Sequence, residues 1–151
     1  MLNAGMMSSN RDDWETPWDL FNSLNAEFGF TLDACAEPSN AKCKHYLTKQ
    51  DDAFSRKWQG VVWMNPPYGK PIGKWLQKAY SESLYGATVV CLVPARTDTE
   101  WWHDWCVRGE VRLLKGRVRF VGAKATAPFP SAVVVFKRCA EGSDARGRES
   151  G

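Results

Sequence analysis

The four residues Asn65-Pro66-Pro67-Tyr68 combine the groups needed to bind a planar ring that carries an amino group. Both prolines fix φ and lack an N–H donor, and a residue before proline is pushed toward extended geometry. We therefore expect a stiff turn that presents an amide side chain, carbonyl oxygens without competing donors and an aromatic face. Carbonyl oxygens suit an amine donor, and a tyrosine face suits a ring. The four residues alone also fit a proline-rich turn in which Tyr68 only packs on the protein body.

This turn follows a predicted strand, and other polar residues stand at the ends of further predicted strands. The apolar run at residues 60–64 predicts a buried strand that ends at the turn. The alternating run 30–35 predicts a short strand with Asp33 near its end, and Arg96 follows the continuous apolar run 87–93. Ligands of open α/β sheets bind beyond the carboxyl ends of the strands. We therefore expect these polar residues to converge on one site.

Three helices are predicted, each from a start signal and a terminal glycine, at residues 16–29, 71–86 and 97–109. Thr16 has the residue type of an N-cap and is followed by a proline, which suits the first helical position. Thr97 and the glutamate three residues later match a capping box for the third helix. The second helix has the clearest apolar stripe at helical spacing. Helices thus alternate with the predicted strands.

The last third of the chain predicts strands at residues 111–115, 117–121 and 131–137, with a loop at 122–130. Short connections between these strands favour an antiparallel hairpin. The whole pattern indicates an α/β sheet whose carboxyl-terminal strands are antiparallel.

A chain of 151 residues is long enough for one domain with a sizeable core. Its 44% hydrophobic and 25% charged residues are typical of a soluble globular protein. We predict the folded domain at residues 14–138. The polar stretch 1–13 is expected to be a flexible leader, and residues 139–151 are expected to be a disordered tail.

The net charge of +3 and pI near 8.6 permit a nucleic-acid partner without requiring one. No signal peptide and no apolar run of membrane length is visible, so we expect no membrane attachment. The five cysteines are scattered without a CxxC pair, which favours reduced thiols in the cytoplasm. Cys35, Cys43 and His45 lack a fourth ligand and zinc-site spacing, so we expect no metal.

Several segments, in order, resemble the small Dam-type DNA N-6-adenine methyltransferases that phages and prophages encode. The resemblance covers the chain from Trp14 to Phe136. It is carried by Trp14-Glu15-Thr16-Pro17, Leu32-Asp33-Ala34-Cys35-Ala36, Asn40-Ala41-Lys42-Cys43, Asp52-Ala53-Phe54, Asn65-Pro66-Pro67-Tyr68, Leu92-Val93-Pro94-Ala95-Arg96-Thr97-Asp98, Gly116-Arg117 and Pro128-Phe129-Pro130-Ser131.

The resemblance implies a minimal, single-domain Rossmann-like fold, S-adenosylmethionine as methyl donor, and adenine in DNA as acceptor. It also implies protection of phage DNA against restriction, in the cytoplasm of a bacterial host cell. No separate DNA-recognition domain fits into this length, so sequence specificity is expected from loops such as 94–100 and 122–130. The residues indicate neither a monomer nor a dimer.

Site residues follow from the resemblance together with the chemistry of the side chains. The catalytic turn is expected to bind a flipped adenine, with the Asn65 side-chain oxygen and the Pro66 carbonyl accepting from its amine and Tyr68 stacking on its ring. The full catalytic set is Asn65, Pro66, Pro67 and Tyr68. The expected cofactor contacts are Trp14, Thr16, Pro17, Asp33, Cys35, Asn40, Asp52 (or Asp51) and Asn65. The cations expected at DNA phosphates are Lys70, Lys74, Arg96, Arg117 and Arg119.

One departure from related methyltransferases is the absence of a glycine-rich loop after the first strand, where this chain has residues 34–39 without glycine. The cofactor is therefore expected to be held without close backbone approach. Three alternatives share the asparagine-proline turn or the fold. They are methylation of the cytosine N4 amine, methylation of glutamine side chains in proteins, and an inactive DNA-binding relative.

Overall fold

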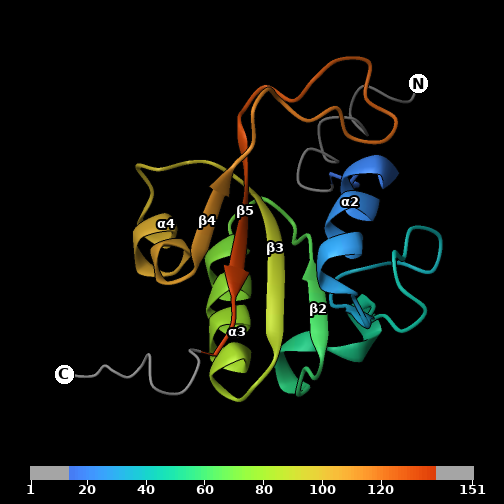
Figure 1. The fold of residues 1–151 in the computed structure, drawn as a ribbon, viewed down its shortest axis with the longest axis vertical. Helices are drawn as coiled ribbons and strands as arrows, with labels where there is room; N and C mark the ends of the chain where they lie inside the picture. The colour runs from blue at the N-terminus through green and yellow to red at the C-terminus, as the bar shows by residue number, and fades with distance from the viewer. Residues whose placement is uncertain (1–13, 139–151) are drawn as a thin grey trace.

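The computed structural model describes residues 14–138. The expected leader (1–13) and tail (139–151) lie outside the described residues, as does Cys139. Within the described part, helices and strands alternate as the sequence predicts, and both helical layers pack on one central sheet (Figure 1).

The sheet has five strands in the order β1-β2-β3-β5-β4. Strands β1 (Leu32–Asp33), β2 (Val61–Met64) and β3 (Thr88–Pro94) are parallel to one another. Strand β5 (Ser131–Phe136) lies antiparallel between β3 and β4 (Glu110–Leu113). The β4–β5 pairing confirms the antiparallel carboxyl-terminal hairpin.

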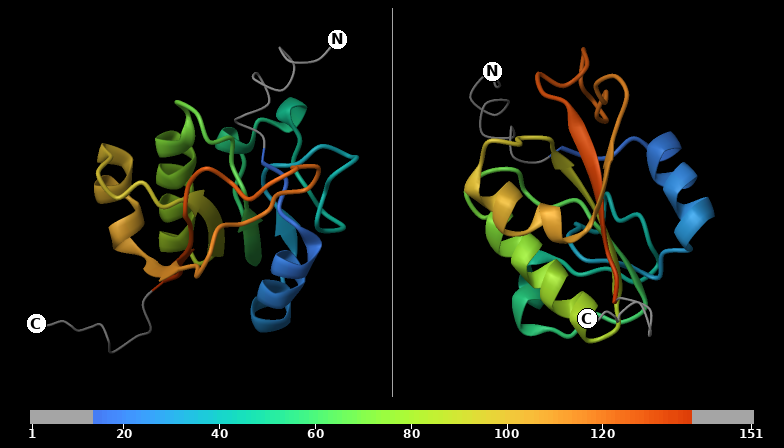
Figure 2. Two further views of the ribbon diagram at one scale, coloured as in Figure 1. Left: turned by 90° about the horizontal axis from the view of Figure 1, so that it is seen from above. Right: turned by 60° about the vertical axis from the view of Figure 1, so that its left-hand side comes forward.

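Helices cover both faces of the sheet, as the two views of Figure 2 show. Helix α2 (Trp18–Phe28) lies on one face, whereas α3 (Ile72–Leu84) and α4 (Glu100–Asp104) lie on the other. Single 3-10 turns complete the connections. They are η2 (Lys49–Asp51), η3 (Ala53–Ser55) and η4 (Cys106–Arg108).

The core is divided by the sheet into two apolar clusters, because successive strand residues point to opposite faces. Val89 and Cys91 of β3 pack toward α3, while Val90 and Leu92 pack toward α2. All four side chains are fully buried. The prediction that this strand is buried on both faces is confirmed.

Two strand predictions need correction. The first strand is only Leu32–Asp33 rather than residues 30–35. The reason is that the Asp33 N–H donates to the His45 carbonyl and the Asp33 carbonyl accepts from the Leu47 N–H, so a loop takes the place of a neighbouring strand. The predicted strand 117–121 is absent. Residues 114–130 instead form a long connection between β4 and β5, hereafter the β4–β5 arm, which projects beyond the sheet in Figure 1.

The predicted helix caps are also partly wrong. Pro17, not Thr16, is the N-cap residue of α2, and it makes no side-chain cap. Thr99, not Thr97, caps α4 by accepting a hydrogen bond from the Trp102 N–H. Gly29 does end α2 in the left-handed conformation, with φ of 71°, as its residue type predicts. Thr16 is therefore available for another role.

Candidate active site

A cavity of about 1000 Å³ lies at the carboxyl ends of β1 and β2. Its walls come from segments far apart in the chain: residues 14–16, the connection after β1, the turn after β2 and the inner edge of the β4–β5 arm. This is the sheet edge at which the sequence places the site. The carboxyl end of β3 does not take part, since residues 94–96 are not among the lining residues.

Most of the predicted site residues line this cavity. The cofactor residues found there are Trp14, Thr16, Asp33, Cys35, Asn40, Asp52 and Asn65, and the turn adds Pro66 and Pro67. Pro17 instead borders a second, smaller hollow of about 490 Å³ beside the base of the β4–β5 arm. Tyr68 is adjacent to the cavity in sequence but is not a lining residue.

The Asn65 side chain is held in a defined orientation. Its Nδ2 donates a hydrogen bond to the backbone carbonyl of Trp14. Its Oδ1 is buried and has no hydrogen-bond partner within residues 14–138. A buried acceptor without a partner costs about 1–3 kcal/mol, so the arrangement is unfavourable unless a donor arrives. Asn65 is thus a ready acceptor for an N–H group.

Tyr68 braces the β4–β5 arm. Its hydroxyl donates to the Leu92 carbonyl at 3.1 Å, and its ring meets Phe120 and Phe129 edge-on at 6.2 and 5.8 Å. Burial raises the pKa of this phenol well above its ordinary value. The hydroxyl is therefore a structural donor, and the orientation of the ring is fixed.

Asp33 is the buried carboxylate of the cavity, with 2% of its surface exposed. One oxygen accepts from the Cys35 N–H at 3.2 Å and the other from the Lys42 N–H at 2.9 Å. Burial raises the pKa of Asp33 from 3.8 to about 6, although both backbone hydrogen bonds and the charge of Lys42 act in the opposite direction. Asp33 therefore carries its negative charge at neutral pH in a partly desolvated place.

The backbone N–H groups of residues 34–36, directly after β1, are not available to bind a ligand in the cavity. The N–H groups of Ala34, Cys35 and Ala36 donate to Trp63 O at 2.9 Å, Asp33 Oδ1 at 3.2 Å and Leu47 O at 3.0 Å. Each donor that a glycine-rich loop would direct at a ligand is already used inside the protein. A ligand in this cavity must be held mainly by side chains.

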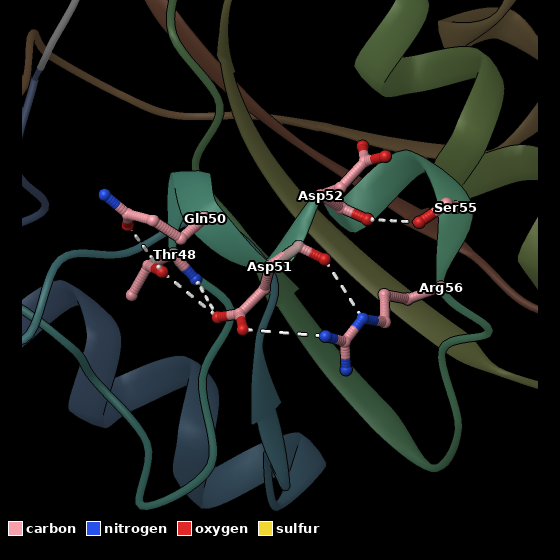
Figure 3. A network of polar contacts seen from close by, with 6 residues as sticks. All are labelled: Thr48, Gln50, Asp51, Asp52, Ser55 and Arg56. Atoms are coloured by element: carbon pink, nitrogen blue, oxygen red, sulfur yellow. Dashed lines mark hydrogen bonds and ion pairs between the residues drawn. The ribbon is translucent and has the colours of Figure 1, made fainter.

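The two adjacent carboxylates Asp51 and Asp52 have different roles, as Figure 3 shows. Asp51 accepts from the Thr48 N–H at 2.8 Å and from its hydroxyl at 3.1 Å, and it lies 3.6 Å from Arg56. These bonds cap η2 and lower the pKa of Asp51. Asp52 lines the cavity, and its carboxylate points away from this network. Its backbone has a φ of 52°.

Asp52 is the one described residue other than glycine with a positive φ. Such strained conformations concentrate at functional sites. Of the two aspartates between which the sequence does not decide, Asp52 is thus the one placed to meet a ligand. Ser55 holds it there by donating both its N–H and its hydroxyl to the Asp52 carbonyl at 3.0 Å.

Further groups complete the wall. The Thr16 hydroxyl is buried and has no partner among residues 14–138. The Asn40 side chain accepts from the Glu37 N–H at 2.8 Å and so shapes its own turn. Phe54 and Trp75 form an aromatic pair with ring centroids 4.5 Å apart, and both line the cavity. The cavity therefore offers aromatic surface, an unpaired hydroxyl and four carboxylates, those of Glu15, Asp33, Glu37 and Asp52.

Sequence reasoning missed one pair of cavity residues, Glu15 and Lys42. The Lys42 ammonium lies 3.2 Å from Glu15 Oε2, and its side chain is only 3% exposed. This ion pair cannot be predicted from a local sequence pattern, because the two residues are 27 positions apart. The only available signal was that both stand inside segments that carry the family resemblance.

The family model for "DNA N-6-adenine-methyltransferase (Dam)" matches residues 3–140, which include the whole described domain. The chain belongs to this family. A relative from Haemophilus phage HP1 (strain HP1c1), named "DNA N-6-adenine-methyltransferase", is 34% identical over 127 residues, covering 80% of this chain and 73% of the relative. A protein of Escherichia coli (strain K12), named "Putative methyltransferase YfdM", is 38% identical over 65 residues, covering 38% of this chain and 71% of the relative.

Family membership makes the chain an adenine-specific DNA methyltransferase. The expected Dam-type resemblance is thereby confirmed. Of the alternatives that the turn left open, the family favours the adenine amine over the cytosine amine, over glutamine side chains and over a binding module without activity.

The cations expected at DNA are all exposed on this methyltransferase, but they do not form one cluster. Lys74 lies over the Phe54 ring at 4.7 Å, and Arg96 lies over Phe129 at 5.4 Å. Arg117 and Arg119 border the smaller hollow at the base of the β4–β5 arm. Lys70 is exposed just after the turn. The cations thus lie on different elements, and none of them lines the large cavity.

Residues 14–138 of the methyltransferase contain no group of three or more His, Cys, Asp or Glu side chains that is arranged to hold a metal ion. The same residues contain no helix that is long and apolar enough to cross a membrane.

Proposed function

We propose that this methyltransferase transfers a methyl group from S-adenosylmethionine to the N6 amine of an adenine that has been extruded from DNA. The observation that carries the proposal is the buried Asn65 Oδ1, which has no partner within the described domain. Its location at the end of β2, on a cavity of about 1000 Å³, supports an incoming amine as the missing donor.

The exocyclic amine of adenine is a poor nucleophile because its lone pair is delocalised into the ring. Asn65 Oδ1 and the Pro66 carbonyl accept one hydrogen bond each from the two amine hydrogens. These bonds favour a tetrahedral nitrogen and localise the lone pair toward the electrophile. Pro66 and Pro67 fix the turn before reaction, so the acceptors need no reorganisation in the transition state. The amine loses its proton after the transfer, once methylation has made it acidic.

Extruding a base from a duplex costs a few kcal/mol. Stacking on Tyr68 returns about 1–3 kcal/mol, as for other base–aromatic contacts. Tyr68 does not line the cavity itself, so the base would meet it beside the turn, where its hydroxyl bond to Leu92 and its contacts with Phe120 and Phe129 fix the ring in advance. The remaining affinity comes from the exposed cations Lys70, Lys74, Arg96, Arg117 and Arg119, which contact the DNA phosphates.

The cavity residues fit S-adenosylmethionine, which supplies an electrophilic methyl group on a positively charged sulfonium. Asp33 holds the ammonium group of the methionine end, and the unpaired Thr16 hydroxyl bonds to the same end. The free carboxylate of Asp52 accepts from the adenine amine of the cofactor. The orphaned Thr16 hydroxyl is the observation that supports the fit, because it is buried without a partner among the described residues.

The fold and the biological role belong to the same proposal. A parallel β1-β2-β3 sheet with its site at the strand ends supports a minimal Rossmann-like methyltransferase fold. The phage origin of one relative supports modification of phage DNA against restriction, in the cytoplasm of a bacterial host.

The test is to incubate the protein with labelled S-adenosylmethionine and unmodified DNA and then to digest the DNA to nucleosides. Labelled N6-methyladenine is the expected product. Label in cytosine, label only in protein, or no transfer at all would contradict the proposal.

Asn65→Ala tests the mechanism. It removes one preorganised acceptor and should lower kcat by about 10²–10³-fold, by comparison with loss of a single oxyanion-hole donor. Cofactor affinity measured by calorimetry should fall far less than kcat, because Asn65 is one of several expected cofactor contacts. Wild-type turnover in this variant would remove Asn65 from the mechanism.

A further inference from the structure

The segment that orients Asn65 has no secondary structure of its own. Residues 14–16 precede α2 and belong to neither a helix nor a strand. The Trp14 carbonyl accepts from Asn65 Nδ2, and the next carbonyl, that of Glu15, accepts from the Val121 N–H of the β4–β5 arm at 3.0 Å. The position of this segment therefore depends on contacts with other elements.

The side-chain ion pair of the segment joins Glu15 to Lys42. The Lys42 ammonium lies 3.2 Å from Glu15 Oε2 and 4.2 Å from the centre of the Trp18 ring. The Lys42 backbone N–H holds Asp33 at 2.9 Å. A buried ammonium is costly unless it is paired, so this lysine keeps Glu15 in one place relative to the end of β1.

The orientation of an asparagine amide matters for the reaction because rotation by 180° exchanges an acceptor for a donor. Only the rotamer with Nδ2 on the Trp14 carbonyl leaves Oδ1 free for the amine of the target base. The reversed amide would present N–H groups to that amine and repel it. Whatever holds the Trp14 carbonyl therefore sets the fraction of molecules that are ready to react.

We propose that Glu15 and Lys42 are positioning residues for methyl transfer, because their ion pair fixes the 14–16 segment that orients the Asn65 amide. The inference rests on the proposed role of Asn65 as acceptor. Neither side chain is proposed to contact the reacting atoms. Their loss lowers the population of the competent amide orientation, so the effect falls on kcat more than on KM for DNA.

The chain supplies a matched control in Lys78. This lysine also pairs with a glutamate, Glu82, at 2.8 Å, and it also lies over a tryptophan, Trp58, at 5.6 Å. Neither Lys78 nor Glu82 lines the cavity. Lys42→Met and Lys78→Met thus remove the same kind of interaction, and only the first removes it from the 14–16 segment.

The experiment measures kcat, KM for DNA and Tm for wild type, Lys42→Met, Glu15→Gln and Lys78→Met, well below every Tm. Lys42→Met and Glu15→Gln should lower kcat by about 10- to 100-fold, as expected for small misplacements of reacting groups. Lys78→Met should lower Tm and keep kcat within about twofold. If Lys42→Met does not fold, the kcat of Glu15→Gln is compared with that of Lys78→Met instead. Wild-type kcat in the Glu15 and Lys42 variants would overturn the inference.

A second readout does not depend on activity. The side-chain amide resonances of Asn65 are identified by their loss in the Asn65→Ala spectrum. They should shift in Lys42→Met and Glu15→Gln and stay unchanged in Lys78→Met. Unchanged resonances in Lys42→Met and Glu15→Gln would overturn the positioning role, even if Asn65→Ala is inactive. Shifted resonances together with an active Asn65→Ala would support the positioning and refute the proposed function instead.

Discussion

Thr16 and Ser131 are chemically similar, since each has a buried hydroxyl without a partner among residues 14–138. Thr16 lines the cavity, whereas Ser131 begins β5 and is not a lining residue. A buried polar group without a partner destabilises the folded state. Under the proposed function, the cost at Thr16 is recovered when the cofactor binds, whereas the cost at Ser131 is not.

Removing each hydroxyl therefore gives different results. Thr16→Val and Ser131→Ala should both leave Tm unchanged or slightly raised in the free protein. Thr16→Val should weaken binding of S-adenosylmethionine by about tenfold, the equivalent of one hydrogen bond. Ser131→Ala should bind it like wild type. Calorimetric titration of both variants checks this, and equal affinities would exclude Thr16 as a cofactor contact.

Asp33 gives the site a pH dependence. Its pKa of about 6 is raised by burial, and the neighbouring charge of Lys42 limits the shift. Because the folded pKa exceeds the ordinary value of 3.8, the contribution of Asp33 to stability is complete below pH 3.8. That contribution is lost as the pH rises through about 6. For attraction of a cationic cofactor the sign is opposite, since only the ionised carboxylate attracts it.

Cofactor affinity should therefore increase as the pH rises from 5 to 7 and level off above it. The dissociation constant should change by up to about tenfold per pH unit below pH 6. Asp33→Asn removes the titrating group, so its affinity should be low and nearly constant over this range. Calorimetry at several pH values measures both proteins. A wild-type affinity that does not change between pH 5 and 7 would contradict the role of Asp33.

At the scale of elements, the β4–β5 arm combines an apolar base with a cationic outer side. Phe120, Ala127 and Phe129 are buried against the α2 face of the sheet. Residues 114–130 include several lysines and arginines and no acidic residue. An exposed segment with this composition suits a phosphate backbone, which each Lys or Arg contact binds with release of counterions.

The arm predicts a specific salt dependence of DNA binding. Arg117→Ala and Arg119→Ala should each reduce the slope of log affinity against log salt by about 1, if each cation meets one phosphate. The loss should be similar for different DNA sequences. Lys57→Ala is the control, because this exposed lysine precedes β2 at its opposite end. Fluorescence anisotropy at several salt concentrations gives the slopes, and a wild-type slope in the arginine variants would contradict the assignment.

The arm also shows where local sequence patterns fail. The alternating residues 117–121 predict a strand, but no neighbouring strand among residues 14–138 pairs with them. The Val118 carbonyl instead accepts from the Ala127 N–H within the same loop. Aromatic packing of Phe120 takes the place of a strand neighbour. Helix α3 and strand β3 were predictable because one long pattern defines each of them. The extent of β1 was not, since the pairing of Asp33 with Tyr46 depends on a loop.

At the scale of the whole molecule, the cavity joins the amino-terminal segment, two strand ends and the arm. The sequence placed Asn65, Asp33 and Thr16 at this site because motifs mark them. It did not reveal the Glu15–Lys42 pair or the bracing role of Tyr68, which are long-range contacts that only the fold creates. Motifs thus identify groups that line the cavity, whereas the residues that support those groups can be identified only from the three-dimensional structure.

A ligand that bridges these segments should stabilise the whole domain. Saturation with S-adenosylmethionine at 100 times its dissociation constant adds about 2.7 kcal/mol. For a chain of this size, that corresponds to an increase in Tm of roughly 5–10 °C. Arg117→Ala, outside the cavity, should show the same increase, and Asp52→Ala should show a smaller one. Thermal unfolding with and without the cofactor measures this, and an unchanged Tm in the wild type would argue against the cavity as its site.

The anchoring of the β4–β5 arm has a consequence for evolution. The ends of the arm are tied down by the Leu114 N–H on Ser131 O at 3.1 Å and the Ala95 N–H on Pro130 O at 2.8 Å. Phe120 and Phe129 fix its base to the sheet, and the stretch between them is mostly exposed. The same stretch also forms one wall of the cavity, and its Val121 N–H donates to the Glu15 carbonyl. A sequence change in this stretch would therefore alter the cavity wall and the outer surface of the arm together, while the sheet register stays the same. Under the proposed function, DNA preference and cofactor binding would then diverge together among relatives.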